Sequence, residues 1–291
     1  MTLQPVVHDA NINRQAAPHA AALSSRIAIR LEGVSKTYLG QARTVEALLP
    51  VDLEVAEGEF VCLVGPSGCG KSTLLSIIAG LERASGGTVW ANGQAVRDPG
   101  VDRVLLFQEA ALFPWLDVRS NIAFGLHQAG FPKRQRDEAV DRLITSVGLA
   151  GFERSFVHQL SGGMRQRAAI ARALAVDPAV LLMDEPFGAL DALTRDRLHA
   201  EVESLWAATR KTILFVTHNV REAVALGDRV LVFSPRPGRI VREFRIDLRR
   251  PRSLEDHALV DQAAEVMAAL REEIKAQERF DSRGEANGRD K

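Results

Sequence analysis

The stretch Gly65-Pro66-Ser67-Gly68-Cys69-Gly70-Lys71-Ser72-Thr73 decides the fold. It follows the continuous apolar run Phe60–Val64, which is typical of a strand buried on both faces, and it leads into a predicted helix over Ser72–Leu81. Glycines let such a loop curl so that its backbone N–H groups point inward, and the N-terminus of the helix adds partial positive charge. The stretch therefore predicts a phosphate-binding site at the end of a buried strand.

The spacing Gly65-x4-Gly70-Lys71-Ser72 matches the P-loop pattern of nucleotide-binding proteins. In this pattern the lysine reaches the β- and γ-phosphates and the serine hydroxyl ligates Mg²⁺. We therefore expect residues 65–73 to bind the phosphates of ATP, with Ser72 as a magnesium ligand. The pattern by itself does not distinguish one class of P-loop enzyme from another.

Working outward from this loop, the rest of the chain alternates between strand and helix patterns. Apolar runs predict buried strands at Arg103–Phe107, Val180–Met183, Thr212–Val216 and Arg229–Phe233. Helical patterns lie at Lys133–Val147, Gly163–Ala175, Asp191–Ala208 and Arg221–Leu226. This alternation predicts an α/β fold with a mostly parallel sheet.

The sequence divides into three parts. Residues 1–25 show no periodicity and are expected to form a flexible arm, and the main domain spans residues 26–245. Within that domain, Ile27–Leu31 and Val51–Val55 alternate like half-buried strands, and residues 110–160 are expected to form a helical insertion.

Residues 246–291 are expected to contain a linker, a helix and a polar tail. The basic linker is Arg249-Arg250-Pro251-Arg252, and Ser253 is predicted to cap a helix that runs to about Arg279. The apolar stripe expected on this helix consists of Leu254, Val266, Leu270 and Ile274.

Two acids follow the apolar run at 180–183. Asp184 at the end of a strand beside the phosphate loop is suited to the Mg²⁺ shell, and Glu185 is suited to orienting or deprotonating an attacking water. The alternative interpretation is a solvated acid pair in a turn, which is common.

A second anion-binding pattern occurs in Leu160-Ser161-Gly162-Gly163-Met164-Arg165-Gln166-Arg167. Ser161 is a good N-cap, and Gly162 and Gly163 expose backbone N–H groups at the start of a helix. A glycine-entered helix with an ordinary cap is the alternative. Two anion sites in one chain require either two anions or two chains.

Composition narrows the classes further. The chain has 291 residues, and Lys+Arg and Asp+Glu are equal at 37 each, which weighs against bulk nucleic-acid binding. Its two cysteines, Cys62 and Cys69, have neither a disulfide framework nor zinc-ligand spacing. No apolar run reaches roughly 18 residues and no secretory signal is apparent, so we expect a cytoplasmic protein whose membrane role comes through a partner.

From about Ile27 to Arg245 the chain resembles the nucleotide-binding subunits of ABC transporters, and Leu160–Arg167 resembles their signature motif. The other family elements occur in the expected order: Tyr38 as the aromatic that stacks on adenine, Gln108 as the Q-loop glutamine, Asp184 and Glu185 as the Walker B pair, Gly188-Ala189-Leu190-Asp191 as the D-loop, and His218 as the switch histidine. One departure is Asn219, where the family often has aspartate.

Taken singly, three of these residues have plainer interpretations. Tyr38 can be a packing aromatic, Gln108 a surface glutamine, and His218 a satisfied loop histidine. Their order and spacing together support the resemblance.

The resemblance implies a P-loop NTPase (RecA-like) core with a mixed, mostly parallel sheet, an antiparallel β subdomain and a helical insertion subdomain. It implies catalysis by Glu185, His218 and Gln108, with Ser72, Gln108 and Asp184 at the metal. It also implies a head-to-tail pair in which Ser161–Gly163 and Asp191 of one copy complete the ATP site of the other. Hydrolysis then opens the pair.

The partners implied are transmembrane permease subunits and, indirectly, a periplasmic or extracellular solute-binding protein, with the chain at the cytoplasmic face of the membrane. Phe113, Trp115 and Leu116 are expected to form either a groove for a partner helix or the core of the helical insertion. Together with Phe233–Ile240, the run Leu112–Leu126 resembles the nitrate, sulfonate and taurine branch of importers.

Two rival classes are considered. A non-transport ABC ATPase of the repair or translation type usually carries long coiled-coil insertions or two cassettes, and neither is apparent here. A small-molecule P-loop kinase has no need for Leu160–Arg167 or for a histidine after the later strand.

Overall fold

A six-stranded sheet forms the centre of the computed structural model, which describes residues 26–40, 44–188 and 190–288. Its strands are ordered β10 (Ile240–Arg245), β9 (Arg229–Phe233), β3 (Phe60–Val64), β8 (Thr212–Val216), β7 (Val180–Asp184) and β6 (Arg103–Leu106). Neighbours from β9 to β6 run parallel, and β10 alone pairs antiparallel, with β9. The expected α/β fold with a mostly parallel sheet is confirmed.

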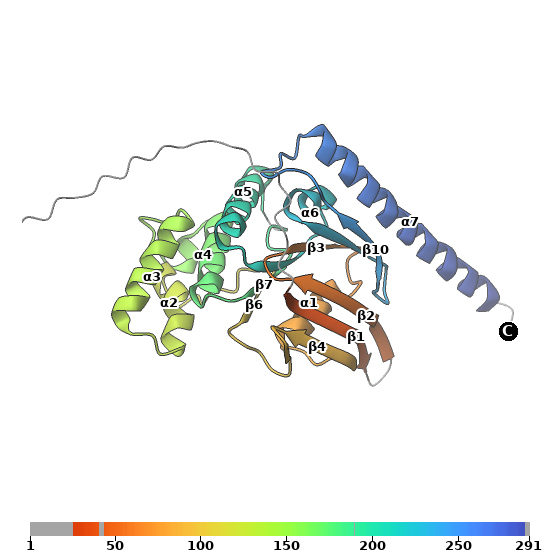
Figure 1. Cartoon of the computed structure of the whole chain (residues 1–291), viewed down its shortest axis with the longest axis horizontal. Helices are drawn as coiled ribbons and strands as arrows, with labels where there is room; N and C mark the ends of the chain where they lie inside the picture. Colours follow the sequence, from red (N-terminus) through yellow and green to blue (C-terminus); the bar gives the residue numbers. More distant parts are fainter. Residues whose placement is uncertain (1–25, 41–43, 189, 289–291) are drawn as a thin grey trace, which may run out of the picture.

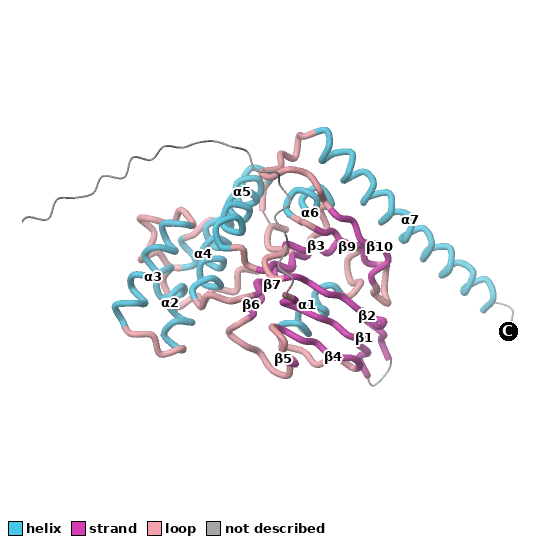
Figure 2. The backbone as a smooth tube through the Cα atoms, viewed as in Figure 1, coloured by secondary structure: helices cyan, strands magenta, loops and turns pink. Residues whose placement is uncertain are grey.

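The antiparallel β subdomain is a second sheet, ordered β2 (Thr44–Ala56), β1 (Ile27–Leu39), β4 (Gly86–Ala91) and β5 (Gln94–Ala95). Figure 2 shows the two groups of strands. Strands β1 and β2 are longer than their alternating stretches predicted, because the register shifts along the pair and breaks the alternation. Strands β4, β5 and β10 were not predicted, since they are short and largely exposed.

The core lies on both faces of the parallel sheet. Phe60, Cys62 and Val64 of β3 join one apolar cluster, while Val61 and Leu63 join another. The first cluster includes residues of helices α4 (Gly162–Ala175), α5 (Ala192–Thr209), α6 (Val220–Leu226) and α7 (His257–Gly288). The second includes residues of α1 (Lys71–Ala79) and of the antiparallel sheet. Every residue of β3 and β8 is buried, because successive side chains of a strand point to opposite faces and both faces are covered. The helices that flank β3 and β8 are α1 (Lys71–Ala79), α5 (Ala192–Thr209) and α6 (Val220–Leu226).

A separate group of helices packs around its own apolar cluster. It consists of α2 (Val118–Gln128), α3 (Lys133–Ser146), the short helix η1 (Val157–Gln159) and α4 (Gly162–Ala175). Figure 1 shows α2, α3 and α4 together on one side of the molecule. Helices α2 and α3 and η1 lie within residues 110–160, where the sequence predicted a helical insertion.

The C-terminal helix α7 (His257–Gly288) packs on α6 and β9 and then leads away from the domain (Figure 1). Its buried stripe is Leu259, Ala263, Val266 and Leu270, at helical spacing. The predicted cap was wrong: Ser253 accepts the N–H of Glu255 in a preceding turn, and the helix begins four residues later. Asp256 lies directly before the helix and accepts the N–H of Ala258.

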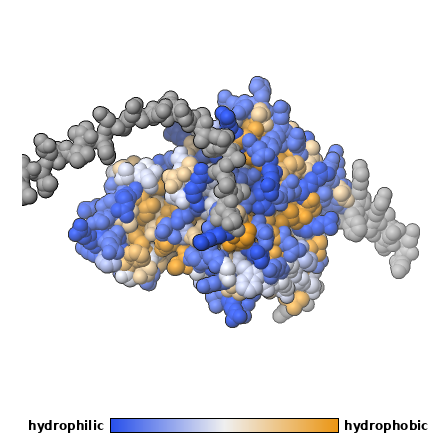
Figure 3. Space-filling view, in the orientation of Figure 1, coloured by the Kyte–Doolittle hydropathy of each residue, from blue (hydrophilic) through white to orange (hydrophobic). Residues whose placement is uncertain are grey.

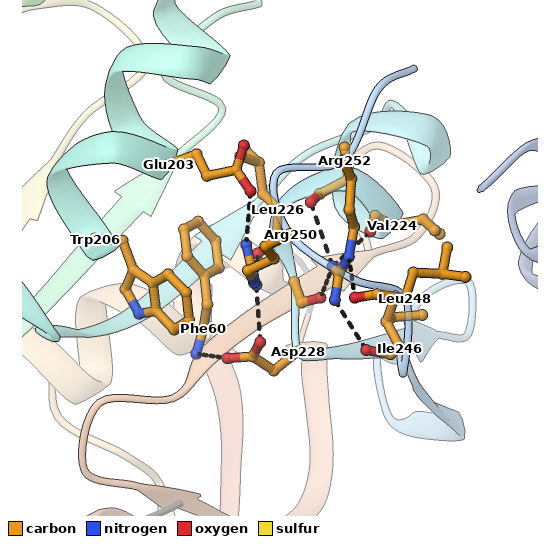
Figure 4. A network of polar contacts seen from close by, with 12 residues as sticks. Phe60, Glu203, Trp206, Val224, Leu226, Asp228, Ile246, Leu248, Arg250 and Arg252 are labelled. Atoms are coloured by element: carbon orange, nitrogen blue, oxygen red, sulfur yellow. Dashed lines mark hydrogen bonds and ion pairs between the residues drawn. The ribbon is translucent and has the colours of Figure 1, made fainter. Parts of the chain in front are cut away.

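Two arginines of the predicted basic linker fold into the domain (Figure 4). The guanidinium of Arg250 lies 4.2 Å from the centre of the Trp206 ring, donates to Asp228 Oδ1 at 2.8 Å, and lies 3.5 Å from a carboxylate oxygen of Glu203. Its side chain is only 9% exposed, so Arg250 joins α5 to the loop after α6 rather than standing in solvent.

The guanidinium of Arg252 donates to backbone carbonyls instead of a carboxylate (Figure 4). The acceptors are the oxygens of Val224, Ala225, Gly227, Ile246 and Leu248. Burial, and then the charge of Arg250, lower the pKa of Arg252 to about 10, so the group stays charged at neutral pH and complements the carbonyl end of α6. The linker is therefore an integral part of the fold around α6.

In the described ranges, no helix combines the length and the apolar character needed to cross a bilayer. The face in Figure 3 is mostly hydrophilic, with smaller hydrophobic areas between the charged ones. The predicted flexible arm at residues 1–25 lies outside the described residues.

Candidate functional site

The predicted phosphate loop and three of the predicted functional segments follow four neighbouring parallel strands. The phosphate loop follows β3, His218 follows β8, Asp184 and Glu185 lie at the end of β7, and Gln108 follows β6. These strands stand in the order β3, β8, β7, β6, and the carboxyl ends of parallel strands meet at one edge. Ligands of open α/β sheets bind at this edge, so the sheet order gathers these residues at one site.

The phosphate loop is shaped by two left-handed glycines. Gly68 has φ 74° and Gly70, which caps α1, has φ 104°, a conformation that favours glycine. Lys71 begins α1 and is 4% exposed, and its Nζ donates to the carbonyls of Gly65 at 2.9 Å and Pro66 at 2.8 Å. The ammonium is thus held against the loop's own backbone, beside exposed Ser67 and Gly68.

Because Gly65 has no side chain, the backbone at the start of the loop can lie close to Phe233 and Cys69. A Cβ there would lie 2.9 Å from Cβ of Phe233 and 3.1 Å from Sγ of Cys69. Cys69 is 1% exposed and packs in the apolar core, so only its backbone is available to a ligand. If Cys69 contacts the nucleotide as expected, it does so through its backbone, because its thiol is buried.

A hydrogen bond between Ser72 and Asp184, two predicted magnesium ligands, joins α1 to β7. The hydroxyl of Ser72 donates to Oδ1 of Asp184 at 3.0 Å, although the residues are 112 positions apart in the chain. Burial raises the pKa of Asp184, and the Ser72 hydrogen bond opposes that shift. One hydroxyl and one carboxylate oxygen side by side are the hard oxygen donors that Mg²⁺ prefers, and Mg²⁺ usually takes few protein ligands. The donor set fits that ion.

Glu185 and His218 also meet. Nδ1 of His218 lies 3.1 Å from Oε2 of Glu185. Glu185 has φ 45°, a strained value for a non-glycine residue, and its N–H donates to the carbonyl of Val216 at 2.9 Å. The turn after β7 is thereby pinned to the end of β8, which brings the carboxylate to the imidazole. Strain of this kind concentrates at functional sites.

Gln108 lies beside the same turn. A Cβ placed on Gly188 would be 3.5 Å from Gln108 Nε2 and 3.7 Å from Glu185 Oε2. The predicted Q-loop glutamine and the predicted catalytic carboxylate therefore share one neighbour.

Tyr38 reaches the phosphate loop from the antiparallel sheet. Its hydroxyl donates to Glu82 Oε2 at 2.8 Å and lies 3.4 Å from Thr73 Oγ1. Partial burial is the main cause that raises its pKa, so the phenol stays protonated. The residue is 39% exposed, beside the helix that follows the phosphate loop, which is compatible with the predicted stacking on adenine.

The signature segment has other neighbours. Ser161 caps α4 by accepting the N–H of Met164 at 3.3 Å. A Cβ on Gly162 would meet Leu190 at 3.4 Å, and one on Gly163 would meet Thr194 at 2.5 Å. These neighbours lie at and after the predicted D-loop, not in the phosphate loop.

Asp191 of the predicted D-loop caps α5 by accepting the N–H of Thr194 at 3.0 Å. Ala189 of the same segment lies outside the described residues. Asp191 and the signature segment thus lie at the starts of two helices, α5 and α4, that contact each other.

A buried polar cluster that no sequence pattern predicted lies beside this site. His199 of α5, Glu222 of α6 and Thr217 before His218 are all buried and bonded to one another. A histidine and a glutamate within helical patterns normally indicate exposed positions, so no local signal identifies them.

A groove of about 310 Å³ is lined in part by Phe107, the residue before Gln108. Phe113 lies in it, with its ring 4.5 Å from the ring of Phe124 and 5.3 Å from the guanidinium of Arg172. Trp115 is 70% exposed next to Phe113, and Leu116 is half-buried. Phe113 therefore lines a groove while Trp115 stays on the surface, and none of the three residues belongs to the apolar cluster of the helical group.

Comparison with known proteins gives consistent matches. Residues 48–188 match the family model described as "ABC transporter". The taurine import ATP-binding protein TauB of Roseobacter denitrificans is 50% identical over 69% of this chain and 75% of its own length. The nitrate import ATP-binding protein NrtD of Synechocystis is 46% identical over 76% of this chain and 83% of its own length.

A solved structure also resembles this one. It is a dimeric ATP-binding cassette in a post-hydrolysis state bound to ADP and phosphate. It is 32% identical, covers 75% of this chain and 98% of its own, and has a TM-score of 0.68.

Proposed function

Since the chain belongs to the ABC transporter family as an ATP-binding, ATP-hydrolysing subunit of importers, we propose that it powers the uptake of taurine, nitrate or an aliphatic sulfonate. The relatives' names support this choice of solute. The ATPase site itself contacts phosphates rather than cargo, so the solute follows from the importer with which the subunit assembles. The repair or translation type of ABC ATPase is not favoured by these relatives.

The observation that carries the proposed site is the juxtaposition of two pairs at one sheet edge: Ser72 with Asp184, and Glu185 with His218. We assign the ATP phosphates to the backbone N–H groups of residues 65–73 and to Nζ of Lys71, which must exchange its loop carbonyls for phosphate oxygens. Tyr38 is assigned to the adenine ring.

The metal position is assigned to Ser72, Asp184 and Gln108, since hydroxyl, carboxylate and amide oxygens suit Mg²⁺. When bound, the ion neutralises charge on the β- and γ-phosphates. Asp184 must be ionised for this role, and the Ser72 hydrogen bond favours the ionised form.

Glu185 is assigned to the attacking water. The water oxygen bonds to the γ-phosphorus, the bond to the bridging oxygen of ADP breaks, and the water proton passes to the Glu185 carboxylate. His218 fixes that carboxylate through the 3.1 Å contact, so the two act as a unit. Gln108 adjoins the same turn, and the residue before it, Phe107, lines the Phe113 groove.

A second copy is assigned to complete the site. Ser161–Gly163 presents backbone N–H groups at the start of α4, but its neighbours in the same chain are Leu190 and Thr194. A head-to-tail pair places this anion-binding end over the γ-phosphate of the partner, with Asp191 nearby. The dimeric, ADP-bound cassette of similar fold supports this arrangement.

Permease subunits are the remaining proposed partners. The groove lined by Phe113, together with the exposed Trp115 whose ring contacts Phe113, offers an apolar surface for a short helix of a transmembrane subunit. We place the chain on the cytoplasmic face of the membrane through this contact, with a solute-binding protein reached only indirectly.

Replacing Glu185 with glutamine tests the site. Glu185→Gln keeps the size of the side chain but removes the proton acceptor, so we expect turnover to fall about 100-fold or more while ATP affinity is retained. Lys71→Ala is the matched control and should weaken ATP binding itself in direct titration. An unchanged turnover rate of the Glu185→Gln chain would overturn the assignment.

The choice of solute is tested in the assembled importer. The chain co-purified with its permease and solute-binding protein should show ATP hydrolysis stimulated by taurine, nitrate or an aliphatic sulfonate. Stimulation by none of the three rejects this solute class and leaves the ATPase assignment standing.

A further inference from the structure

Three polar side chains are buried together beside the Glu185–His218 pair. Thr217, Glu222 and His199 are 2%, 3% and 7% exposed. One carboxylate oxygen of Glu222 contacts Nε2 of His199, and the other accepts the hydroxyl of Thr217. Burying polar groups is unfavourable unless they are bonded, so a fully internal cluster of this kind calls for a role.

The direction of one hydrogen bond in the cluster follows from its neighbours. Thr217 Oγ1 accepts the N–H of Asn219 at 3.0 Å, so its own proton goes to Glu222. The other oxygen of Glu222 forms a hydrogen bond with Nε2 of His199, whose donor is set by the histidine tautomer. Nδ1 of His199 has no hydrogen-bond partner among the residues described. The imidazole is thus oriented through Glu222 and by packing.

That packing leads back to the catalytic carboxylate. The His199 ring meets the Phe187 ring edge-on, with centroids 5.2 Å apart and an interplanar angle of 61°. Phe187 is two residues after Glu185, in the turn whose strained start is pinned to Val216. The ring of one buried histidine therefore supports the segment that carries Glu185.

The same cluster supports the segment that carries His218. Thr217 immediately precedes His218, and its N–H donates to the carbonyl of Leu63 at 3.2 Å, in the strand that enters the phosphate loop. Its side chain is tied to Glu222 in the first turn of α6. Both ends of the 3.1 Å Glu185–His218 contact are consequently held by the His199–Glu222–Thr217 cluster.

We propose that His199, Glu222 and Thr217 are positioning residues that hold Glu185 and His218 in the geometry required for hydrolysis. The inference rests on the proposed function, because it takes Glu185 and His218 as the reacting pair. A misplacement of about 1 Å in such a pair can cost about 100-fold in rate without touching substrate binding. The cluster should therefore affect kcat and spare the affinity for ATP.

Matched variants of the full-length chain separate this role from plain folding. Thr217→Val and His199→Leu roughly keep the volume but remove a hydrogen-bond partner of Glu222, whereas Thr217→Ser and His199→Gln keep one. We expect the first two to lower kcat about 10- to 100-fold with the KM for ATP and the directly titrated ATP affinity unchanged. The serine and glutamine variants should retain most of kcat. Rates are compared well below the lowest melting temperature.

Glu222→Met gives a second route should either of the other apolar variants fail to fold. It is similar in length, but it has no oxygen to bond Thr217 or His199, so both hydrogen bonds are lost and the same fall in kcat is expected. Equal kcat in the matched pairs, or a parallel loss of kcat and ATP affinity, would overturn the inference. Glu185→Gln tests the proposed function separately. If that variant hydrolyses ATP at the normal rate, the catalytic assignment of Glu185 is rejected, independently of the positioning role.

Discussion

Asn219 shows how a single residue keeps its structural role while its charge changes. It follows His218 at a position where the family often has aspartate. Its side-chain oxygen accepts the N–H groups of Arg221 at 3.1 Å and Glu222 at 3.4 Å, which caps α6. Asparagine and aspartate cap helices about equally well. The substitution therefore preserves the start of α6 and removes a negative charge next to the histidine.

Asp184 is predicted to make the nucleotide-free fold less stable as the pH rises. Burial raises its pKa in the folded chain, so the folded state binds this proton more tightly than the unfolded state. Its stabilising contribution is present below the ordinary aspartate pKa of about 3.9 and is lost as the pH rises through the raised value. Asp184→Asn should therefore unfold at a higher temperature than the wild type at pH 7.

The measurement is thermal unfolding of both chains across pH, without nucleotide. The advantage of the asparagine variant should shrink as the pH falls toward about 4. Mg²⁺ with ATP should stabilise the wild type and not the variant, because the carboxylate ligand is gone. A variant advantage that stays constant with pH would contradict the expected titration of Asp184.

At the scale of elements, α1 and α2 are both followed by a left-handed glycine, but in different surroundings. Gly80 caps α1 with φ 78°, and Gly130 follows α2 with φ 74°. A Cβ on Gly80 would lie 2.4 Å from the carbonyl oxygen of Asp98, whereas a Cβ on Gly130 would meet nothing within 4 Å. The end of α1 is thus packed against the chain that leads into β6.

Gly80→Ala and Gly130→Ala therefore form a matched pair. We expect Gly130→Ala to cost about 1–2 kcal/mol for the left-handed backbone alone. Gly80→Ala should cost about 1–3 kcal/mol more, because the overlap is with backbone and the helix end must shift. Urea unfolding of both variants measures the difference. Equal losses would show that the contact at Asp98 relaxes freely.

For the whole molecule, the main consequence of the proposed head-to-tail pair is that one chain carries two half-sites. The phosphate loop and its catalytic pairs gather at the edge of the parallel sheet, while Ser161–Gly163 packs on Leu190 and Thr194. In a symmetric head-to-tail pair, the phosphate loop of each copy meets the signature segment of the other. Each ATP is then shared by two chains.

Mixing two inactive variants tests this sharing. Lys71→Ala disables the phosphate loop, and Ser161→Asp keeps a capping oxygen for α4 but places a negative charge against the γ-phosphate. Each variant alone should be nearly inactive. In a mixed pair, one site combines an intact phosphate loop with an intact signature segment, so part of the ATPase activity should return. No recovery on mixing, with pairs detected by size, would place each complete site within a single chain.

Local sequence determined the elements whose signals lie within a few residues. The glycine spacing at 65–73, the apolar runs of β3, β8 and β9, and the cap at Ser161 each predict their own element, because backbone conformation and burial on both faces leave a short-range pattern. Motif order also nominated Tyr38, Gln108 and His218. Strands β4, β5 and β10 were missed because that pattern is weak there, and the cap of α7 was missed because a nearby residue, Asp256, takes the position.

Tertiary structure alone decided which of those residues meet. The order β3, β8, β7, β6 puts Ser72 against Asp184 and Glu185 against His218, at separations of 112 and 33 residues. It likewise buries His199 with Glu222 and turns Arg252 from a linker cation into a partner for the carbonyls at the end of α6. The physical reason is that these side-chain hydrogen bonds join elements that are far apart in the sequence. Packing of the elements brings the partners together, and the local sequence around either partner does not predict it.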